Sequence, residues 1–337
     1  MLKKLISLCK KSLTWSRLIN IIKLFISYRL SIITKKPIVW GYPPIVMIEP
    51  TNFCNLKCPL CPSGAGLLKR ERGHMSLKLF KQIIDEIEKY TFMILLWNQG
   101  EPFLNPDIIE MIEYANSKKI YIMTSTNANI LPEADDIVNS ELDLMLISLD
   151  GATQETYNKY RQNGSLEKVI ANVKSLVEAK KKNKSTLQLI NQFLVMKHNE
   201  NEIEKIKQIT KDLELDDIVL KNVQIYTKED VNTYLPQNPK YRRYKISGDN
   251  FELKFGIKNR CYRIWFQPVI NWDGEFSVCC FDKDIDYKVG NVKKHYFYDL
   301  WKSKRMTVFR QTILKNRKLF EICRNCGEGV SLKIKKG

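Results

Sequence analysis

The 337-residue sequence predicts an α/β fold: a partial, TIM-like barrel of six β/α units, with a small cysteine-rich C-terminal module and a basic helical N-terminal leader. Two observations predict the barrel. Short apolar runs alternate with segments whose apolar residues recur at helical spacing, which is typical of parallel strands joined by crossover helices. Polar or cysteine-containing segments follow the first four runs, and active sites gather at the carboxyl ends of parallel strands.

The expected strands and helices alternate along the chain. The strands are the apolar runs at 45–49, 93–97, 120–124, 142–149, 187–196 and 217–220. The helices are expected at 77–90, at 107–117, before residue 142, from Gln154, from Leu166 and at 202–213. These units occupy about 180 residues, whereas a complete eight-unit barrel takes about 250. The sequence therefore predicts six units.

Periodicity lapses between residues 227 and 260, a polar stretch that contains Pro236 and Pro239. Such a lapse between periodic segments is typical of a boundary. The sequence therefore divides into four parts. These are a basic amphipathic N-terminal segment (1–40), the barrel (41–226), a linker (227–260) and the C-terminal module (261–337).

Half of the net charge of +18 lies in the N-terminal segment, which has nine Lys or Arg residues and no acidic residue before Glu49. Lys23 and Arg29 interrupt its apolar stretches, so neither a secretory signal nor a membrane span is expected. The pattern indicates one or two basic amphipathic helices. We expect a helix docked on the protein with its lysines in water. Peripheral contact of residues 1–36 with an anionic membrane is the alternative.

Cysteine usage indicates the compartment. Nine cysteines without a signal peptide favour metal ligation in a reducing cytoplasm over a disulfide framework. Eight of them form two clusters, at 54–61 and 261–326, and Cys9 stands apart. The positive charge would permit nucleic-acid contact. It is not interleaved with aromatic residues, however, and no nucleic-acid partner is expected.

The first cluster places Cys54, Cys58 and Cys61 in the loop after the first expected strand. Thiolates are soft ligands suited to iron–sulfur clusters or zinc. Three protein ligands on a four-iron cluster leave one iron open for chemistry. Zinc is the alternative, but the nearest histidine, His74, lies thirteen residues beyond Cys61.

This spacing, in the context of residues 48–56, resembles the radical S-adenosylmethionine (SAM) superfamily, in its branch with a C-terminal SPASM or twitch module. The resemblance covers about residues 43–326. It implies that the three cysteines hold a 4Fe-4S cluster whose free iron is chelated by SAM. An electron from a flavodoxin- or ferredoxin-type reductant then cleaves SAM to methionine and a 5′-deoxyadenosyl radical. The sequence departs from the family at Leu60, where an aromatic residue is usual.

The same resemblance implies a set of SAM contacts. Gly100, Glu101 and Pro102 match the Gly-Glu-Pro element that holds the methionine amino group, with an ordinary strand-end turn as the alternative. Arg161 matches the arginine that meets the SAM carboxylate, with a surface arginine as the alternative. The positions that match ribose and methionine contacts are Ser125, Thr126, Asn127 and Ser148. Ala128 replaces a usual glycine, and a positive φ there would strain the chain.

The second cluster comprises Cys261, Cys279, Cys323 and Cys326. The turn around Gly274 predicts a hairpin that folds Cys261 towards Cys279. Four thiolates can close a cluster completely, which suits electron transfer. The layout resembles a twitch module with one auxiliary 4Fe-4S cluster, and a zinc ribbon is the alternative. Spacing favours Cys279 over its neighbour Cys280 as the ligand.

The resemblance implies an oxidoreductase-type radical SAM enzyme with one of two chemistries. We expect two-electron oxidation of a small or saccharide-like molecule, because only about forty residues precede the barrel. Modification of a peptide or protein is the alternative. A hypothesis of another class is a nucleic-acid-binding or redox scaffold with structural clusters. Asp273 and Asp282 are candidate bases near the second cluster, and neither is assigned.

Overall fold

The computed structural model describes residues 11–247 and 250–327. Residues 1–10, with Cys9, lie outside the described residues, as do 248–249 of the expected linker and 328–337 of the expected module. Within the described ranges, no helix is both long enough and apolar enough to cross a membrane.

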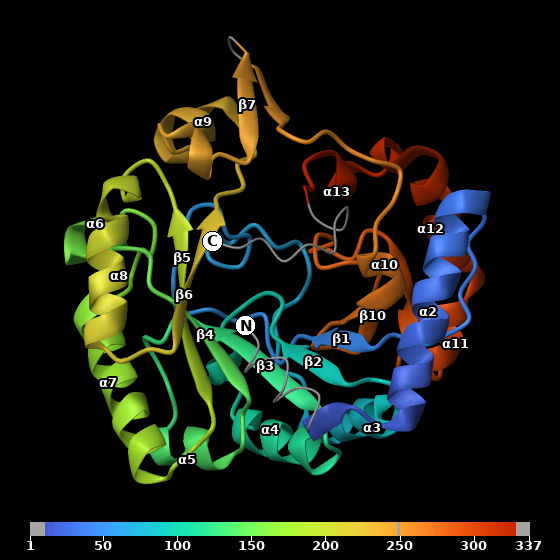
Figure 1. Ribbon diagram of the computed structural model, residues 1–337, viewed down its shortest axis with the longest axis horizontal. Coiled ribbons are helices and arrows are strands. Elements are labelled where there is room, and N and C mark those ends of the chain that lie inside the picture. Colours follow the sequence, from blue (N-terminus) through green and yellow to red (C-terminus); the bar gives the residue numbers. More distant parts are fainter. Residues whose placement is uncertain (1–10, 248–249, 328–337) are drawn as a thin grey trace.

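Six parallel strands follow one another across the barrel sheet in chain order, as the sequence predicts. Each expected run forms a strand whose ends shift by at most a few residues. Figure 1 shows these strands as a curved fan with the crossover helices outside it. The strands are β1 (Ile45–Ile48), β2 (Met93–Leu96), β3 (Tyr121–Thr126), β4 (Leu144–Ser148), β5 (Gln188–Val195) and β6 (Asp217–Asn222).

The crossover helices also match their expected positions. Helix α3 shows why: the Ser76 side chain accepts from the Leu79 N–H and begins the helix. Four of its apolar residues, Phe80, Ile83, Ile84 and Ile87, are spaced by three and four and are almost fully buried. Each such burial stabilises the fold by about 1.5–3 kcal/mol. The crossover helices are α3 (Leu77–Ile87), α4 (Ile108–Ser117), α5 (Ala134–Asn139), α6 (Gln154–Asn158), α7 (Leu166–Lys182) and α8 (Ile203–Asp212).

The C-terminal module continues the barrel sheet. Strand β9 (Val269–Ile270) pairs in parallel with β1, so that Ile270 lies opposite Ile48. Strands β10 (Glu275–Ser277) and β11 (Lys288–Asn291) follow in antiparallel order. The β9–β10 turn contains Gly274 at φ +86°, which confirms the expected hairpin. Because β9 runs parallel to β1, the β9–β10 turn lies beside the loop after β1, where Trp272 Nε1 donates to Glu71 O at 3.3 Å.

The segment expected as a linker has secondary structure of its own. It forms helix α9 (Lys228–Tyr234) and a hairpin of β7 (Tyr244–Ser247) and β8 (Asn250–Leu253), at the top of Figure 1. Thr227 begins α9 through a reciprocal capping box with Asp230, a local signal that strengthens a short helix.

Helices surround the module's hairpin and join it to the leader. The leader forms α2 (Trp15–Thr34), whose Tyr28 ring lies 5.3 Å from Trp265 and 5.8 Å from Phe266. The leader is therefore docked on the protein, as expected. The module helices are α10 (Arg263–Phe266), α11 (Phe297–Lys302), α12 (Lys304–Asn316) and α13 (Glu321–Arg324).

Candidate functional site

The first cysteine loop is fixed by backbone contacts at the carboxyl ends of the strands. The Glu101 N–H donates to Phe53 O at 2.7 Å, and the Lys57 N–H donates to Gln162 O at 3.0 Å. Within the loop, the Cys61 N–H donates to Cys58 O at 3.1 Å. Cys58 is buried, whereas the two other cysteines of the loop are half-buried. The three thiols therefore stand on a segment that is held by the end of β2 and by the connection between α6 and α7.

Gly100 allows the strand β2 end to approach this loop. Its φ is +77°, and a Cβ atom would lie 2.6 Å from both Thr51 O and Phe53 O. Backbone atoms cannot yield to such a contact. The Gly100 N–H also donates to Ser63 Oγ at 3.0 Å, and Ser63 in turn donates to Gln99 Oε1 at 3.2 Å. The Gly-Glu-Pro element is therefore a packed contact with the cysteine loop and more than an ordinary turn.

The Glu101 side chain is buried and bridges two strand ends. Its carboxylate accepts from the Asn127 N–H at 2.7 Å and from the Phe103 N–H at 3.4 Å. Burial raises the pKa of Glu101 to about 7 in spite of these donors. Pro102 begins the short helix that follows, Pro102–Leu104. A cation that enters the site would therefore form an ion pair with the buried Glu101 carboxylate.

The end of strand β3 also meets the cysteine loop. Asn127 Nδ2 donates to Asn55 Oδ1 at 2.9 Å, which ties the strand end to the loop. Ala128 adopts φ +55°, the left-handed conformation for which the family usually has glycine. Its N–H donates to Thr126 Oγ1 at 2.9 Å, which helps to hold that conformation.

Ser125 and Ser148 stand at the ends of the neighbouring strands β3 and β4. Register pairs Ser125 with Leu146 and places Ser148 one residue beyond the last β3–β4 pair. Ser148 is buried and Ser125 half-buried. The expected SAM-contact residues of β3 and β4 thus lie at one edge of the sheet.

Arg161 lies between a buried carboxylate and the cysteine loop. Its Nε and Nη2 atoms each lie 2.6 Å from Asp150 Oδ2, and its Nη1 lies 3.9 Å from Cys58 Sγ. Burial opposes the charge, but Asp150 and Cys58 raise the pKa of Arg161 above its ordinary value. The alternative of a surface arginine is therefore wrong. Sequence reasoning did not single out Asp150, although it follows Ser148 at the same strand end.

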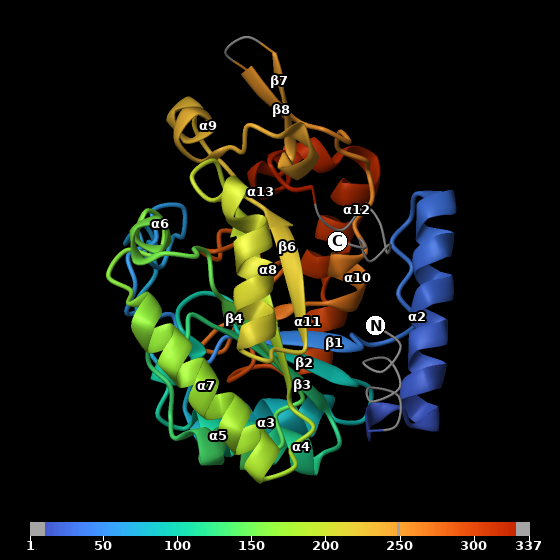
Figure 2. The same ribbon diagram turned by 60° about the vertical axis from the view of Figure 1, so that its left-hand side comes forward.

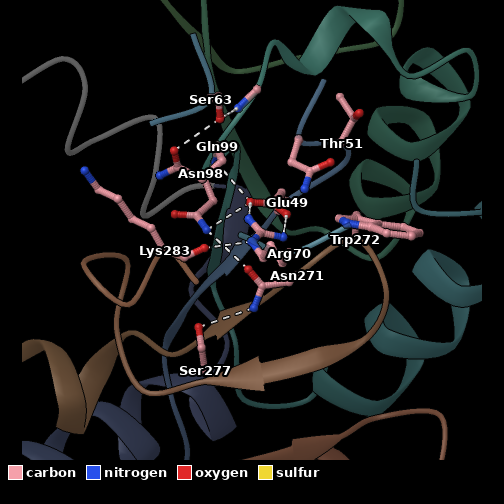
Figure 3. Close-up of polar contacts among 12 residues, drawn as sticks. Glu49, Thr51, Ser63, Arg70, Asn98, Gln99, Asn271, Trp272, Ser277 and Lys283 are labelled. Carbon is pink, nitrogen blue, oxygen red and sulfur yellow. Dashed lines mark hydrogen bonds and ion pairs between the residues drawn. The ribbon is translucent and has the colours of Figure 1, made fainter. Parts of the chain in front are cut away.

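A buried polar network beneath the loop also escaped the sequence analysis (Figure 3). Arg70 holds the fully buried Glu49 through two contacts, of 2.7 and 2.6 Å. The Asn98 side chain and the Gln99 N–H each donate to Glu49 Oε2 at 3.1 Å. Glu49 is the first acidic residue of the sequence and directly follows β1, but no local spacing points to its partner.

The second cysteine set surrounds a small cavity of the module. Cys261, Cys279, Cys323 and Cys326 all line it, and all four are buried. Arg263 and Arg317 line the same cavity, so cationic groups lie beside the four sulfur atoms. The adjacent thiol, that of Cys280, is half-buried and lies 3.6 Å from Arg263 Nη1.

Both thiol sets have the donor chemistry of iron–sulfur clusters. Among the described residues, no group of three or more His, Cys, Asp or Glu side chains is arranged to hold a single metal ion. Thiolates on one tetrahedral zinc lie only about 3.8 Å apart, given Zn–S bonds of about 2.3 Å. Four-iron cubes are larger, and cysteine thiolates are their usual ligands. The three thiols of the loop and the four buried thiols around the module cavity supply the donor sets that two such clusters need.

Comparison with known families agrees with this chemistry. The model of the radical SAM superfamily matches residues 48–210, and that of the SPASM iron–sulfur cluster-binding domain matches residues 261–327. The chain therefore carries a radical SAM domain followed by a SPASM iron–sulfur module. The cofactors that these two domains imply are SAM, a SAM-binding 4Fe-4S cluster and an auxiliary cluster.

Two curated relatives and one solved structure illustrate the range of the family. The chain is 35% identical to the mycofactocin maturase MftC of Mycobacterium tuberculosis over 133 residues, 39% of this chain and only about a third (34%) of that protein. It is 26% identical over 312 residues to the tungsten-containing aldehyde ferredoxin oxidoreductase cofactor-modifying protein of Pyrococcus furiosus. This match covers 83% of this chain and 86% of that protein. The structure of Streptococcus suis SuiB bound to precursor peptide SuiA shares the fold, with a TM-score of 0.61 and 15% sequence identity. The match covers 80% of this chain and 67% of that chain.

Proposed function

We propose that this chain is a maturase, which cleaves SAM reductively and directs the resulting radical to a peptide or protein side chain. One observation carries the SAM chemistry. At one end of the parallel sheet, the Glu101 N–H donates to Phe53 O of the cysteine loop, and Arg161 Nη1 lies 3.9 Å from Cys58 Sγ. The mycofactocin maturase relative and the peptide-bound SuiB structure favour a peptide over the small or saccharide-like substrate expected from sequence.

Each expected SAM contact receives a role in this proposal. Cys54, Cys58 and Cys61 hold the cluster, which when bound supplies the electron that breaks the sulfonium C–S bond. Glu101 offers a carboxylate to the methionine ammonium, and Arg161 offers free N–H groups to the methionine carboxylate. The residues that line the remainder of the SAM site are Gly100, Pro102, Ser125, Thr126, Asn127 and Ser148.

The module provides the second redox site. Cys261, Cys279, Cys323 and Cys326 close the auxiliary cluster, because these four line the cavity and Cys280 does not. The guanidinium groups of Arg263 and Arg317 offset the negative charge of four thiolates. The pKa of Arg317 rises because the nearby thiols outweigh the burial that lowers it. A closed cluster of this kind suits removal of an electron from the substrate.

The SAM chemistry is tested with the full chain reconstituted anaerobically with iron and sulfide. With dithionite and SAM, we expect 5′-deoxyadenosine by mass spectrometry from the wild-type chain and none from Cys58→Ser. Cys280→Ala is the matched control and should retain SAM cleavage. A wild-type chain that contains zinc, or that yields no 5′-deoxyadenosine, would refute the proposal.

The substrate class is tested separately. We expect that co-expression with short open reading frames beside the gene gives one peptide with altered mass, for example by loss of two hydrogen atoms. Unaltered peptides, together with SAM cleavage that is stimulated only by a peptide-free metabolite fraction, would instead favour the small-molecule alternative.

A further inference from the structure

Helix α2 turns its polar side towards the protein. Its buried residues comprise two aromatic or aliphatic side chains and four polar ones: Arg17, Asn20, Leu24, Ser27, Tyr28 and Ser31. The Arg17 guanidinium donates to the carbonyl groups of Ser12, Glu88, Lys118 and Lys119, at 2.6–3.1 Å. The polar side of α2 is thus occupied by contacts with the chain itself.

The remaining polar groups of this side hold the segment that returns from α2 to the barrel. Asn20 donates to Tyr42 O at 2.9 Å and accepts from the Tyr42 N–H at 2.8 Å. Ser31 makes the same pair of contacts with Ile38, at 2.9 and 2.8 Å. These reciprocal bonds fix the rotation of α2 about its axis.

The outer side of α2 is apolar. Trp15 is 79% exposed, Ile33 75%, Ile22 49%, Ile19 47% and Ile26 44%. Intervals of four, three, four and seven residues place these side chains along one side of the helix. We call these five residues the outer stripe. A surface helix of a globular protein ordinarily buries its apolar side. Helix α2 instead buries its polar side and exposes its apolar side.

Figure 2 shows α2 at the outer edge of the molecule, with the helices of the module on one side of it. The outer stripe is therefore accessible to a flat surface. Exposed apolar patches of this kind mark sites that bind a partner.

The charge around the outer stripe identifies the partner. Lys23, Arg29, Lys35 and Lys36 are exposed on or directly after α2. Within the described residues, no ion pair joins these four side chains to a carboxylate. The sequence has no acidic residue before Glu49. Apolar residues with a tryptophan, flanked by Lys and Arg, are the composition of helices that lie in an anionic membrane interface.

We propose that α2 lies on an anionic membrane surface, with the outer stripe at the boundary between headgroups and acyl chains. Hydrogen bonds within the protein satisfy the polar side chains that such a helix usually exposes to water. The basic side chains at the edges of the stripe meet the lipid phosphates. This surface is separate from the cysteine sites, so the inference does not depend on the substrate.

The test measures binding of the full chain to vesicles by flotation. Vesicles of phosphatidylcholine and phosphatidylglycerol in a three-to-one ratio should bind the chain. Pure phosphatidylcholine vesicles should bind it about tenfold more weakly. Ile22→Ser/Ile26→Ser should reduce binding by about tenfold or more, because it removes apolar groups from the bilayer. Phe255→Ser/Leu319→Ser is the matched control, since both residues are exposed and apolar (77% and 63%) but lie elsewhere, and should bind as the wild type does.

Three results would overturn the inference. The wild-type chain could fail to bind either vesicle, or the Ile22/Ile26 variant could bind as well as the control variant. The chain could also form a concentration-dependent dimer without lipid that this variant abolishes, which would assign the outer stripe to self-association. Unchanged thermal unfolding of the variant shows that the protein remains folded.

Discussion

Glu49 and Arg70 form a bidentate ion pair that connects the two cysteine sites. Glu49 follows β1, five residues before Cys54, and its side chain is fully buried. The Arg70 Nε atom donates to Lys283 O at 2.7 Å, in the loop just after Cys279 and Cys280. One guanidinium therefore binds the barrel through a carboxylate and the module through a carbonyl group.

Removal of Arg70 should destabilise the protein severely. Arg70→Ala leaves the Glu49 carboxylate buried without its cation, which costs about 3–5 kcal/mol for a buried pair. The measurement is the free energy of unfolding by urea. The matched control is Arg72→Ala, because Arg72 is exposed two residues further on and should change this energy by less than about 0.5 kcal/mol. Equal effects of the two substitutions would contradict the importance of the pair.

Comparison of Gly100 with Gly66 separates two reasons why a position requires glycine, a positive φ and a close approach of another backbone segment. Both have positive φ, +77° and +72°, but a Cβ at Gly66 meets nothing within 4 Å. Gly66→Ala should therefore cost only the backbone strain, about 1 kcal/mol. Gly100→Ala adds the collision with two carbonyl oxygens and should cost at least about 2 kcal/mol more. Thermal unfolding and iron content after reconstitution test this, and similar unfolding temperatures for the two variants would disprove the close approach.

The raised pKa of Glu101 gives the cluster-free protein a pH-dependent stability. The folded state binds the proton of Glu101 more tightly than the unfolded state, since the pKa rises from 4.5 to about 7. The resulting stabilisation is complete below about pH 4.5 and is lost as the pH rises to about 7, by up to about 3 kcal/mol. Glu101→Gln should remove this part of the pH dependence of unfolding. If the unfolding free energy of the variant depends on pH in the same way as that of the wild type, the Glu101 carboxyl does not have a raised pKa.

Cys279 and Cys280 should differ in iron retention. Cys279→Ser removes a thiol that lines the module cavity and should lower the iron content by up to about half, four of eight atoms. Cys280→Ala should retain the full content, because that thiol does not line the cavity. Iron and sulfide assays, with electron paramagnetic resonance of the reduced protein, distinguish the two variants. Loss of iron in Cys280→Ala alone would reverse the assignment.

The sequence by itself determined the six β/α units, the order of the strands and the hairpin at Gly274. It also placed both sets of thiols in their segments. These features depend on local information: apolar spacing selects a strand or helix, and turn residues end it. Cysteine spacing is equally local, which is why the ligand types could be named without the fold.

Only the tertiary structure decided which distant groups meet. The Glu49–Arg70–Lys283 contact spans more than two hundred residues, and the Arg161–Cys58 contact spans 103. The orientation of α2 was decided in the same way. The sequence indicated that its apolar side would be buried. In the structure, however, Arg17 donates to the carbonyl groups of Ser12, Glu88, Lys118 and Lys119, and these contacts turn the polar side of the helix inward. A buried polar group must find its partners, and the sequence shows the group without showing which surface will provide them.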